Sequence, residues 1–107
     1  MAFYELRQYH INPGKMDEWV AFMEGTIIPF QVSKGMVITG SYRGEEDDSV
    51  YVWTRRFESE AQREAPYAVV YESDFWKNDV SPKVGELIDR SKIKVQRIVP
   101  TPKSVIQ

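Results

Sequence analysis

The sequence contains no cysteine. Disulfide bonds, thiolate metal ligands and cysteine nucleophiles are therefore excluded. Small secreted domains are usually rich in disulfides, so this absence favours a protein that is not secreted. The first ten residues, MAFYELRQYH, contain no charged segment followed by an apolar stretch, and they indicate no signal peptide. We expect a cytoplasmic protein.

An excess of one charge is also lacking. The chain has 14 Lys and Arg against 16 Asp and Glu, which gives a formal net charge of -2. No basic stripe is present that could neutralise nucleic-acid phosphates or bind an anionic membrane surface. No apolar run approaches the roughly 20 residues of a membrane span. We therefore expect neither a nucleic-acid partner nor a membrane partner.

Apolar side chains, in contrast, are sufficient for a core. The chain has 107 residues, of which 42% are hydrophobic and 13% are aromatic. A domain of this length can bury roughly two thirds of the surface that its unfolded chain exposes. The sequence predicts a single folded domain over residues 1–107.

The first third of the chain changes from a strand pattern to a helix pattern. Residues 2–11 alternate with the period of a strand, and NPGK at 12–15 supplies turn residues. A first helix is predicted from Lys15 to residues 27–28, because apolar side chains recur there at helical spacing. Pro29 is expected to kink or end this helix. The recurring residues are Met16, Trp19, Val20, Met23 and Ile27.

The middle of the chain reads as a hairpin followed by a helix. GMVITGSYRG at 35–44 and VYVWTRRF at 50–57 predict two paired strands, and Gly40 indicates a bulge or a close backbone approach. Ser59 and Gln62 have capping-box spacing and predict the start of a second helix that ends near Tyr71.

The last third contains one more helix and one more strand. A helical turn is predicted near residues 74–77, a helix from 81 or 82 to 88, and a fourth strand over 92–99. The element order β-α-β-β-α-β predicts an α+β fold with a four-stranded antiparallel sheet and helices on one face. The other face is too apolar for solvent, so we expect a second subunit to cover it in a homodimer. The tail, residues 100–107, is a candidate to cross this boundary.

Three segments of the sequence resemble one known family. YELRQYHINPGKMDEW at 4–19 is similar to the opening strand, turn and helix of the NIPSNAP family. VYVWTRRFESEAQRE at 50–64 resembles its central Trp-containing strand and the following helix, and SDFWKNDVSPKVGELIDRSKIKV at 73–95 resembles its closing segment. The resemblance implies a ferredoxin-like protomer that pairs sheet to sheet as a dimeric α/β barrel. It implies no established reaction, and in the wider superfamily the sites usually lie between the sheet and the helices of each protomer.

The first strand carries the leading candidate site. Glu5, Arg7 and Tyr9 share one face of it, and charges on a half-buried sheet need partners. One hypothesis is that Glu5 and Arg7 form a structural network with neighbouring strands or across the dimer. The other is that Arg7 binds an anionic or carbonyl-bearing ligand, with Tyr9 as a hydroxyl donor.

His10 is the only histidine of the chain. Zinc is not expected, because a lone histidine has no second ligand of its kind. A haem role would require His10 to point into an apolar cleft, and a solvated or capping role is the simpler reading. The acidic residues 45–48 lack the spacing of a calcium loop. We expect no metal and no cofactor.

Aromatic side chains are numerous enough to line a pocket as well as a core. Trp53 shares a strand face with Tyr51, Arg55 and Phe57, and packing alone would explain it. The ligand-binding candidates are Glu5, Arg7, Tyr9, Trp19, Tyr42, Trp53 and Trp76, and the catalytic candidates are Arg7, Tyr9 and His10.

The sequence supports three hypotheses of function. The first is a NIPSNAP-family homodimer of unestablished molecular function with a small-molecule cleft in each protomer. The second is a cofactor-independent enzyme of the monooxygenase or isomerase type, in which Arg7, Tyr9 and His10 position and polarise an oxygen. The third is a protein-interaction module that uses Val105 and Ile106 of the tail. The sequence alone leaves open whether the protein is an enzyme.

Overall fold

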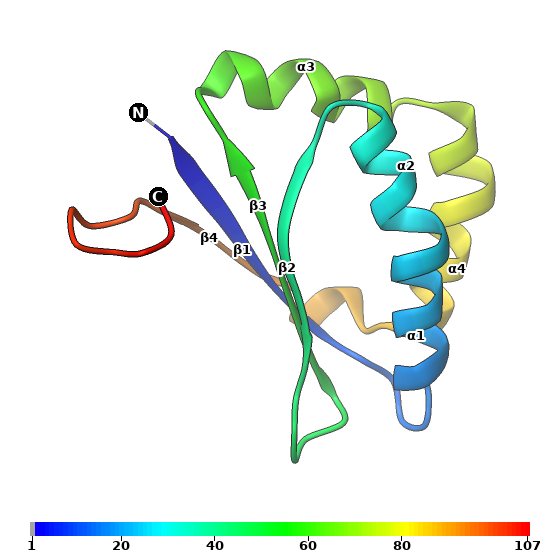
Figure 1. Cartoon of the computed structure of the whole chain (residues 1–107). Coiled ribbons are helices and arrows are strands. Elements are labelled where there is room, and N and C mark those ends of the chain that lie inside the picture. Colours follow the sequence, from blue (N-terminus) through cyan, green and yellow to red (C-terminus); the bar gives the residue numbers. More distant parts are fainter. Residues whose placement is uncertain (1) are drawn as a thin grey trace.

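Four antiparallel strands form one sheet, and the helices lie along one of its faces (Figure 1). The computed structural model describes residues 2–107. The strands are β1 (Phe3–His10), β2 (Val37–Arg43), β3 (Val50–Phe57) and β4 (Lys94–Ile98), in the order β2-β3-β1-β4. This is the predicted α+β, ferredoxin-like βαββαβ fold. None of the helices in residues 2–107 is long and apolar enough to cross a membrane.

Pro29 disturbs the first helix but does not end it. The chain runs through α1 (Met16–Phe22), the π-helical turn η1 (Met23–Ile27) and α2 (Ile28–Ser33). Proline lacks an N–H, and its ring would clash with a carbonyl four residues earlier in a regular α-helix. The wider π turn just before Pro29 accommodates both effects. The same arrangement recurs where η2 (Trp76–Val80) precedes Pro82 in α4 (Ser81–Leu87).

The predicted irregularity at Gly40 is confirmed. The register between β2 and β3 shifts between Ile38 and Gly40. A Cβ atom at Gly40 would lie 2.5 Å from Cε2 of Tyr42 and 2.9 Å from Oγ1 of Thr54. Glycine is therefore needed here for the close approach of two side chains.

The predicted helix cap at Ser59 is also confirmed. The Ser59 hydroxyl accepts a hydrogen bond of 3.1 Å from the Gln62 N–H, at the start of α3 (Glu60–Tyr71). The Gln62 side-chain oxygen accepts from the Glu58 N–H at 3.0 Å. These two bonds satisfy N–H groups that have no partner within the helix.

Replacing Ser59 with alanine should lower the free energy of unfolding by about 1 kcal/mol. The reason is that the Gln62 N–H loses its acceptor at the helix start. Chemical denaturation measures the change, and Ser104→Ala, at a half-buried position of the tail, is the matched control. A loss no larger than that of the control would contradict a stabilising cap.

The sheet has two distinct faces. On the helix-covered face, β3 places Tyr51, Trp53, Arg55 and Phe57, all of which are buried. The main apolar core also lies between this face and the helices. It contains Tyr9, Ile11, Met16, Trp19, Phe22, Met23, Ile27, Tyr51, Trp53, Val80, Val84, Leu87 and Ile88.

The opposite, open face carries no helix, and it is partly covered by the tail (Figure 1). The carbonyl oxygen of Gln107 accepts hydrogen bonds of 2.8 Å from the Tyr4 hydroxyl and from Nε of Arg56. A groove of about 430 Å³ lies between the tail and the sheet. The tail thus folds back on its own sheet, and its crossing to a second subunit stays a prediction.

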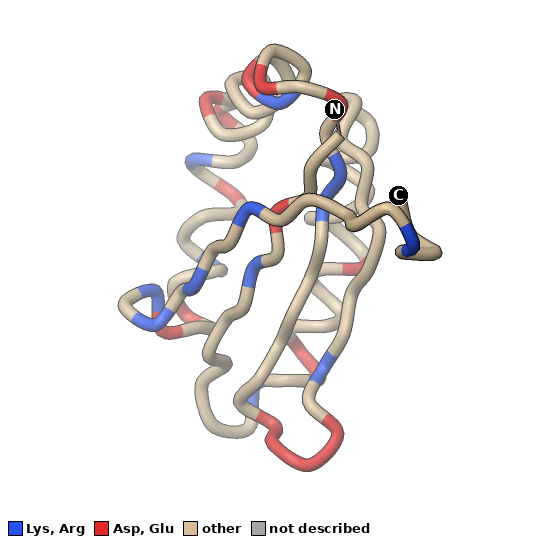
Figure 2. Tube along the Cα trace, turned by 90° about the vertical axis from the view of Figure 1, so that its left-hand side faces the viewer, with Lys and Arg blue, Asp and Glu red and all other residues tan. Residues whose placement is uncertain are grey.

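Charged residues do not gather in a basic stripe along residues 2–107. Figure 2 shows Lys and Arg scattered over the trace, with a run of acidic residues at the tip between β2 and β3. These are Glu45, Glu46, Asp47 and Asp48.

Candidate functional site

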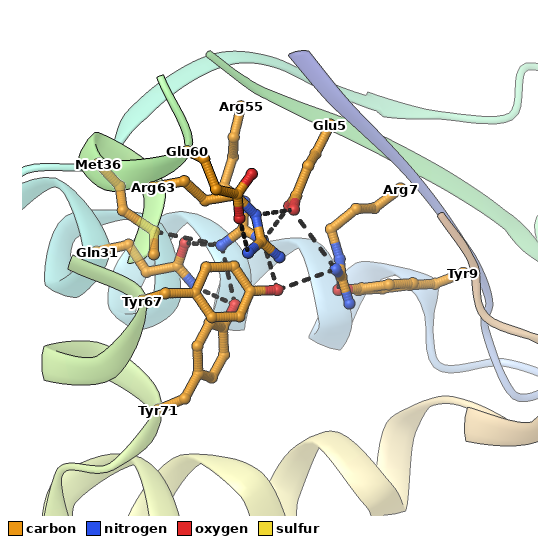
Figure 3. A network of polar contacts seen from close by, with 10 residues as sticks. All are labelled: Glu5, Arg7, Tyr9, Gln31, Met36, Arg55, Glu60, Arg63, Tyr67 and Tyr71. Carbon is orange, nitrogen blue, oxygen red and sulfur yellow. Dashed lines mark hydrogen bonds and ion pairs between the residues drawn. The ribbon is translucent and has the colours of Figure 1, made fainter. Parts of the chain in front are cut away.

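Glu5 is the centre of a buried polar network on the helix-covered face (Figure 3). Its cross-strand partner on β3 is Arg55, whose Nη2 atom lies 2.7 Å from Oε1 of Glu5. The other carboxylate oxygen, Oε2, accepts from Nε of Arg63 on α3 at 2.7 Å. Two strands and a helix therefore meet at one carboxylate.

Arg55 is completely buried and uses most of its donors inside the protein. Its Nη1 atom lies 3.0 Å from Oε1 of Gln31 and 2.9 Å from the Tyr71 hydroxyl. The centre of the guanidinium group lies 4.7 Å from the centre of the Trp53 ring. Ion pairs and aromatic contacts thus replace the water that Arg55 loses on folding.

Two pKa values in the network respond to this environment. Burial alone would raise the pKa of Glu5, but Arg55 and Arg63 hold it below the usual value, so the carboxylate is charged at neutral pH. Burial raises the pKa of Tyr71 although Arg55 acts in the opposite direction, so this phenol keeps its proton.

Arg7 lies beside this network without a carboxylate of its own. Its Nε atom donates to the Tyr9 hydroxyl at 2.9 Å, and its Nη1 atom donates to the Tyr67 hydroxyl at 3.4 Å. Among residues 2–107 its nearest carboxylate is Glu5, at 3.9 Å, and Glu5 already binds two other arginines. The Arg7 side chain is only 16% exposed.

The whole cluster carries more positive than negative charge. Glu60 lies 3.5 Å from Arg63 and 2.6 Å from Arg97, and Glu5 lies 2.7 Å from Arg55 and from Arg63 and 3.9 Å from Arg7. Four arginines, Arg7, Arg55, Arg63 and Arg97, face two glutamates, which leaves a net charge of +2. Arg7 is the arginine with the weakest ionic pairing.

The edge strand β4, which pairs with β1 beside Arg7, is exposed along its length. Val95, the cross-strand partner of Arg7, is 46% exposed although it lies on the helix side of the sheet. The helix layer therefore stops short of β4, and Arg7 lies at the margin between the covered and the uncovered part of this face.

The other residues that we predicted for the site are divided between two faces. Trp19 and Trp53 lie fully buried in the core, where both are near Tyr9, and Trp76 packs edge-on against Tyr71 with ring centres 4.7 Å apart. Tyr42 is exposed on the open face, opposite Val52. His10 pairs with Val50, also on the open face. The structure does not bring Tyr42 or His10 together with Arg7.

Several residues of the network were not among the predicted site residues. Gln31, Arg55, Arg63, Tyr67 and Tyr71 come from three separate elements. Two sequence signals point to part of this set. Arg55 alternates with three aromatic residues on a buried strand face, and Arg63, Tyr67 and Tyr71 recur every four residues on one face of α3.

Metal-ligating side chains do not cluster in the part of the chain that the structure describes. No three His, Asp or Glu residues of this part lie close enough together to hold a metal ion.

A comparison with protein families decides the family. The family model described as NIPSNAP matches residues 4–104 of this chain. The chain belongs to the NIPSNAP family. The resemblance of the three sequence segments is thereby confirmed. No curated protein matches the chain significantly.

Solved NIPSNAP structures have the same fold. A NIPSNAP family protein from Agrobacterium tumefaciens is 20% identical, with a TM-score of 0.88 and 100% of both chains covered. A second one from that organism, described as of unknown function, is 22% identical, with a TM-score of 0.87, covering 99% of this chain and 94% of that chain. An uncharacterized NIPSNAP-like domain protein from Burkholderia xenovorans is 18% identical, with a TM-score of 0.85, covering 96% and 88%. These similarities establish the fold.

Proposed function

We propose that this NIPSNAP protein is a homodimer in which each protomer binds a small molecule beside Arg7. The observation that carries the proposal is the position of Arg7, a largely buried guanidinium group whose nearest carboxylate, among residues 2–107, already binds two other arginines. A buried charge with no close ion pair is costly, and such groups concentrate at binding sites. A ligand that reaches Arg7 along the β4 margin would supply the missing partner.

The open face supports the homodimer. Half-buried or exposed apolar side chains of all four strands lie there, among them Leu6, Val52, Tyr42 and Ile98. Contiguous apolar patches of this kind mark interaction surfaces. A second copy of the same sheet matches this open face in width and polarity. Pairing of the two open faces about a twofold axis leaves the site beside Arg7 free in both protomers.

Mass spectrometry under native conditions tests the proposal directly. We expect protein purified from its own host to be a dimer that retains a small molecule. Arg7→Met should keep the dimer but lose that molecule, because Arg7 donates only to two neutral phenols and its loss breaks no close ion pair.

The matched control is Arg43→Met, which removes an arginine that pairs with Asp17 and Asp48 on the surface. This variant should retain the molecule. A bound molecule that survives Arg7→Met would contradict a site beside Arg7. Unfolding or dissociation of Arg7→Met, with a loss of roughly 3 kcal/mol or more, would show that Arg7 is part of a structural network instead.

A related enzyme is the second candidate function. The hydrogen bond between Nε of Arg7 and the Tyr9 hydroxyl holds both groups within reach of one substrate oxygen, which they could polarise together. His10 would not take part in this chemistry, because it lies on the other face of the sheet. Conversion of the retained molecule during incubation, seen as a change in its mass or, for an isomerisation, in its chromatographic retention time, would favour this function over binding alone.

A further inference from the structure

We infer that the molecule bound beside Arg7 is a carboxylate. This inference rests on the proposed binding site and adds the chemical class of its ligand. The argument compares the hydrogen-bond donors of the network with its acceptors.

The acceptors of the network are already occupied. Both oxygens of Glu5 accept from arginines, and Oε1 of Gln31 accepts from Arg55. The Gln31 amide orientation follows from this contact, since the opposite orientation would place two donors face to face. Each of these oxygens thus already accepts a hydrogen bond from an arginine within the protein.

Three phenol oxygens in the network act as acceptors as well. The Tyr9 hydroxyl accepts from Nε of Arg7. The Tyr67 hydroxyl accepts from Nη1 of Arg7 and from Nη2 of Arg55, each at 3.4 Å. The Tyr71 hydroxyl accepts from Nη1 of Arg55 at 2.9 Å and from Nε2 of Gln31 at 3.2 Å. In each case the partner is a group that can only donate.

Each of these phenols therefore retains its own O–H as a donor. In the hydrogen bonds that they form within residues 2–107, all three hydroxyls act as acceptors. Nε of Arg55 is buried and has no hydrogen-bond partner among these residues. The network thus has a surplus of donors, and two of them, at Tyr9 and Tyr67, belong to the residues that contact Arg7.

A carboxylate matches this surplus in both charge and geometry. It supplies several lone pairs, and its negative charge reduces the net charge of +2 that four arginines and two glutamates leave. A guanidinium group binds the two carboxylate oxygens with two parallel hydrogen bonds. Figure 3 shows the Arg7 guanidinium and the Tyr67 hydroxyl pointing toward each other, so one ligand oxygen could accept from both. A neutral carbonyl group would supply lone pairs but would not reduce the positive charge of the cluster. A cationic ligand would increase that charge.

Benzoate and benzamide form a matched pair of probes for this assignment. The two molecules have nearly the same shape and differ in charge and in one acceptor. Aromatic rings at Tyr67, Tyr71 and Trp76 pack against each other near the network, which makes a flat ring a suitable body for the probe. Saturation-transfer NMR and isothermal titration on the full chain, freed of any retained molecule, measure both affinities.

We expect benzoate to bind at least about tenfold more tightly than benzamide, since charge-assisted hydrogen bonds are stronger than neutral ones. Arg7→Met should abolish this preference. Tyr67→Phe, which removes only the hydroxyl, should weaken benzoate about tenfold, and Arg43→Met should leave both affinities unchanged.

Equal binding of the two probes, with both lost in Arg7→Met, would overturn the carboxylate assignment and leave the proposed site intact. A benzoate preference that survives Arg7→Met would place the anion elsewhere and overturn the inference. If neither probe binds and the protein from its host also carries no molecule, the proposed function fails together with the inference.

Discussion

Arg55→Met is expected to lower the free energy of unfolding by about 3–5 kcal/mol. The substitution removes one of the two close partners of the buried Glu5 carboxylate, which then keeps Arg63 at 2.7 Å and Arg7 at 3.9 Å. It also removes the donor to Oε1 of Gln31, which is fully buried. Urea denaturation monitored by tryptophan fluorescence measures the change. A loss below about 1 kcal/mol would contradict our description of Arg55 as a buried ion-pair partner.

The double variant Glu5→Leu with Arg55→Met distinguishes the contribution of the ion pair to stability from the contribution of side-chain packing. Replacing both members of a buried pair by apolar residues leaves no uncompensated charge between them. We therefore expect the double variant to lose much less stability than the sum of the two single variants. Additive losses would show that the two residues stabilise the protein independently of each other.

Val52→Asp is expected to convert the proposed homodimer to a monomer. Val52 lies on a central strand and on the open face, where a second sheet would bury it. A buried carboxylate without a partner should raise the dissociation constant more than a hundredfold, which corresponds to about 3 kcal/mol. Sedimentation equilibrium measures this constant.

The matched control for the dimer is Val69→Asp. Val69 is 52% exposed and belongs to α3, on the helix side of the molecule. This variant should remain dimeric. A wild-type protein that is monomeric at micromolar concentration would contradict the homodimer, and equal weakening by both variants would show that the open face has no special role.

Local patterns account for the parts of the fold that were predicted correctly. Strand β3 was predicted at 50–57 and runs from Val50 to Phe57. The sequence also predicts the cap at Ser59 and the irregularity at Gly40, and the structure contains both. In each case the signal lies within a few residues, either as an alternation of period two or as a short motif. The helix around Pro29 was extended further than predicted, because a π turn can accommodate proline in a way that propensity does not show.

The candidate site was predicted only in part, because local patterns show which residues share a strand face but not which elements pack against that face. Glu5, Arg7 and Tyr9 were recognised because they alternate on one strand. His10 and Tyr42 were grouped with them, although strand pairing places both on the open face. Gln31 and Tyr67 could not be assigned to the site, since their distance to Arg7 or Arg55 depends on how helices pack over the sheet.

The sequence by itself thus determined the order of the elements, the family, and the face of β1 on which the charges lie. Periodicity and turn residues carry that information, because they act between neighbours in the chain. Only the tertiary structure decided that Glu5 lies 2.7 Å from Arg55 and from Arg63, whereas Arg7 lies 3.9 Å from it. Which charges pair depends on strand register and on the position of α3, and both result from contacts between residues about 50 or more positions apart.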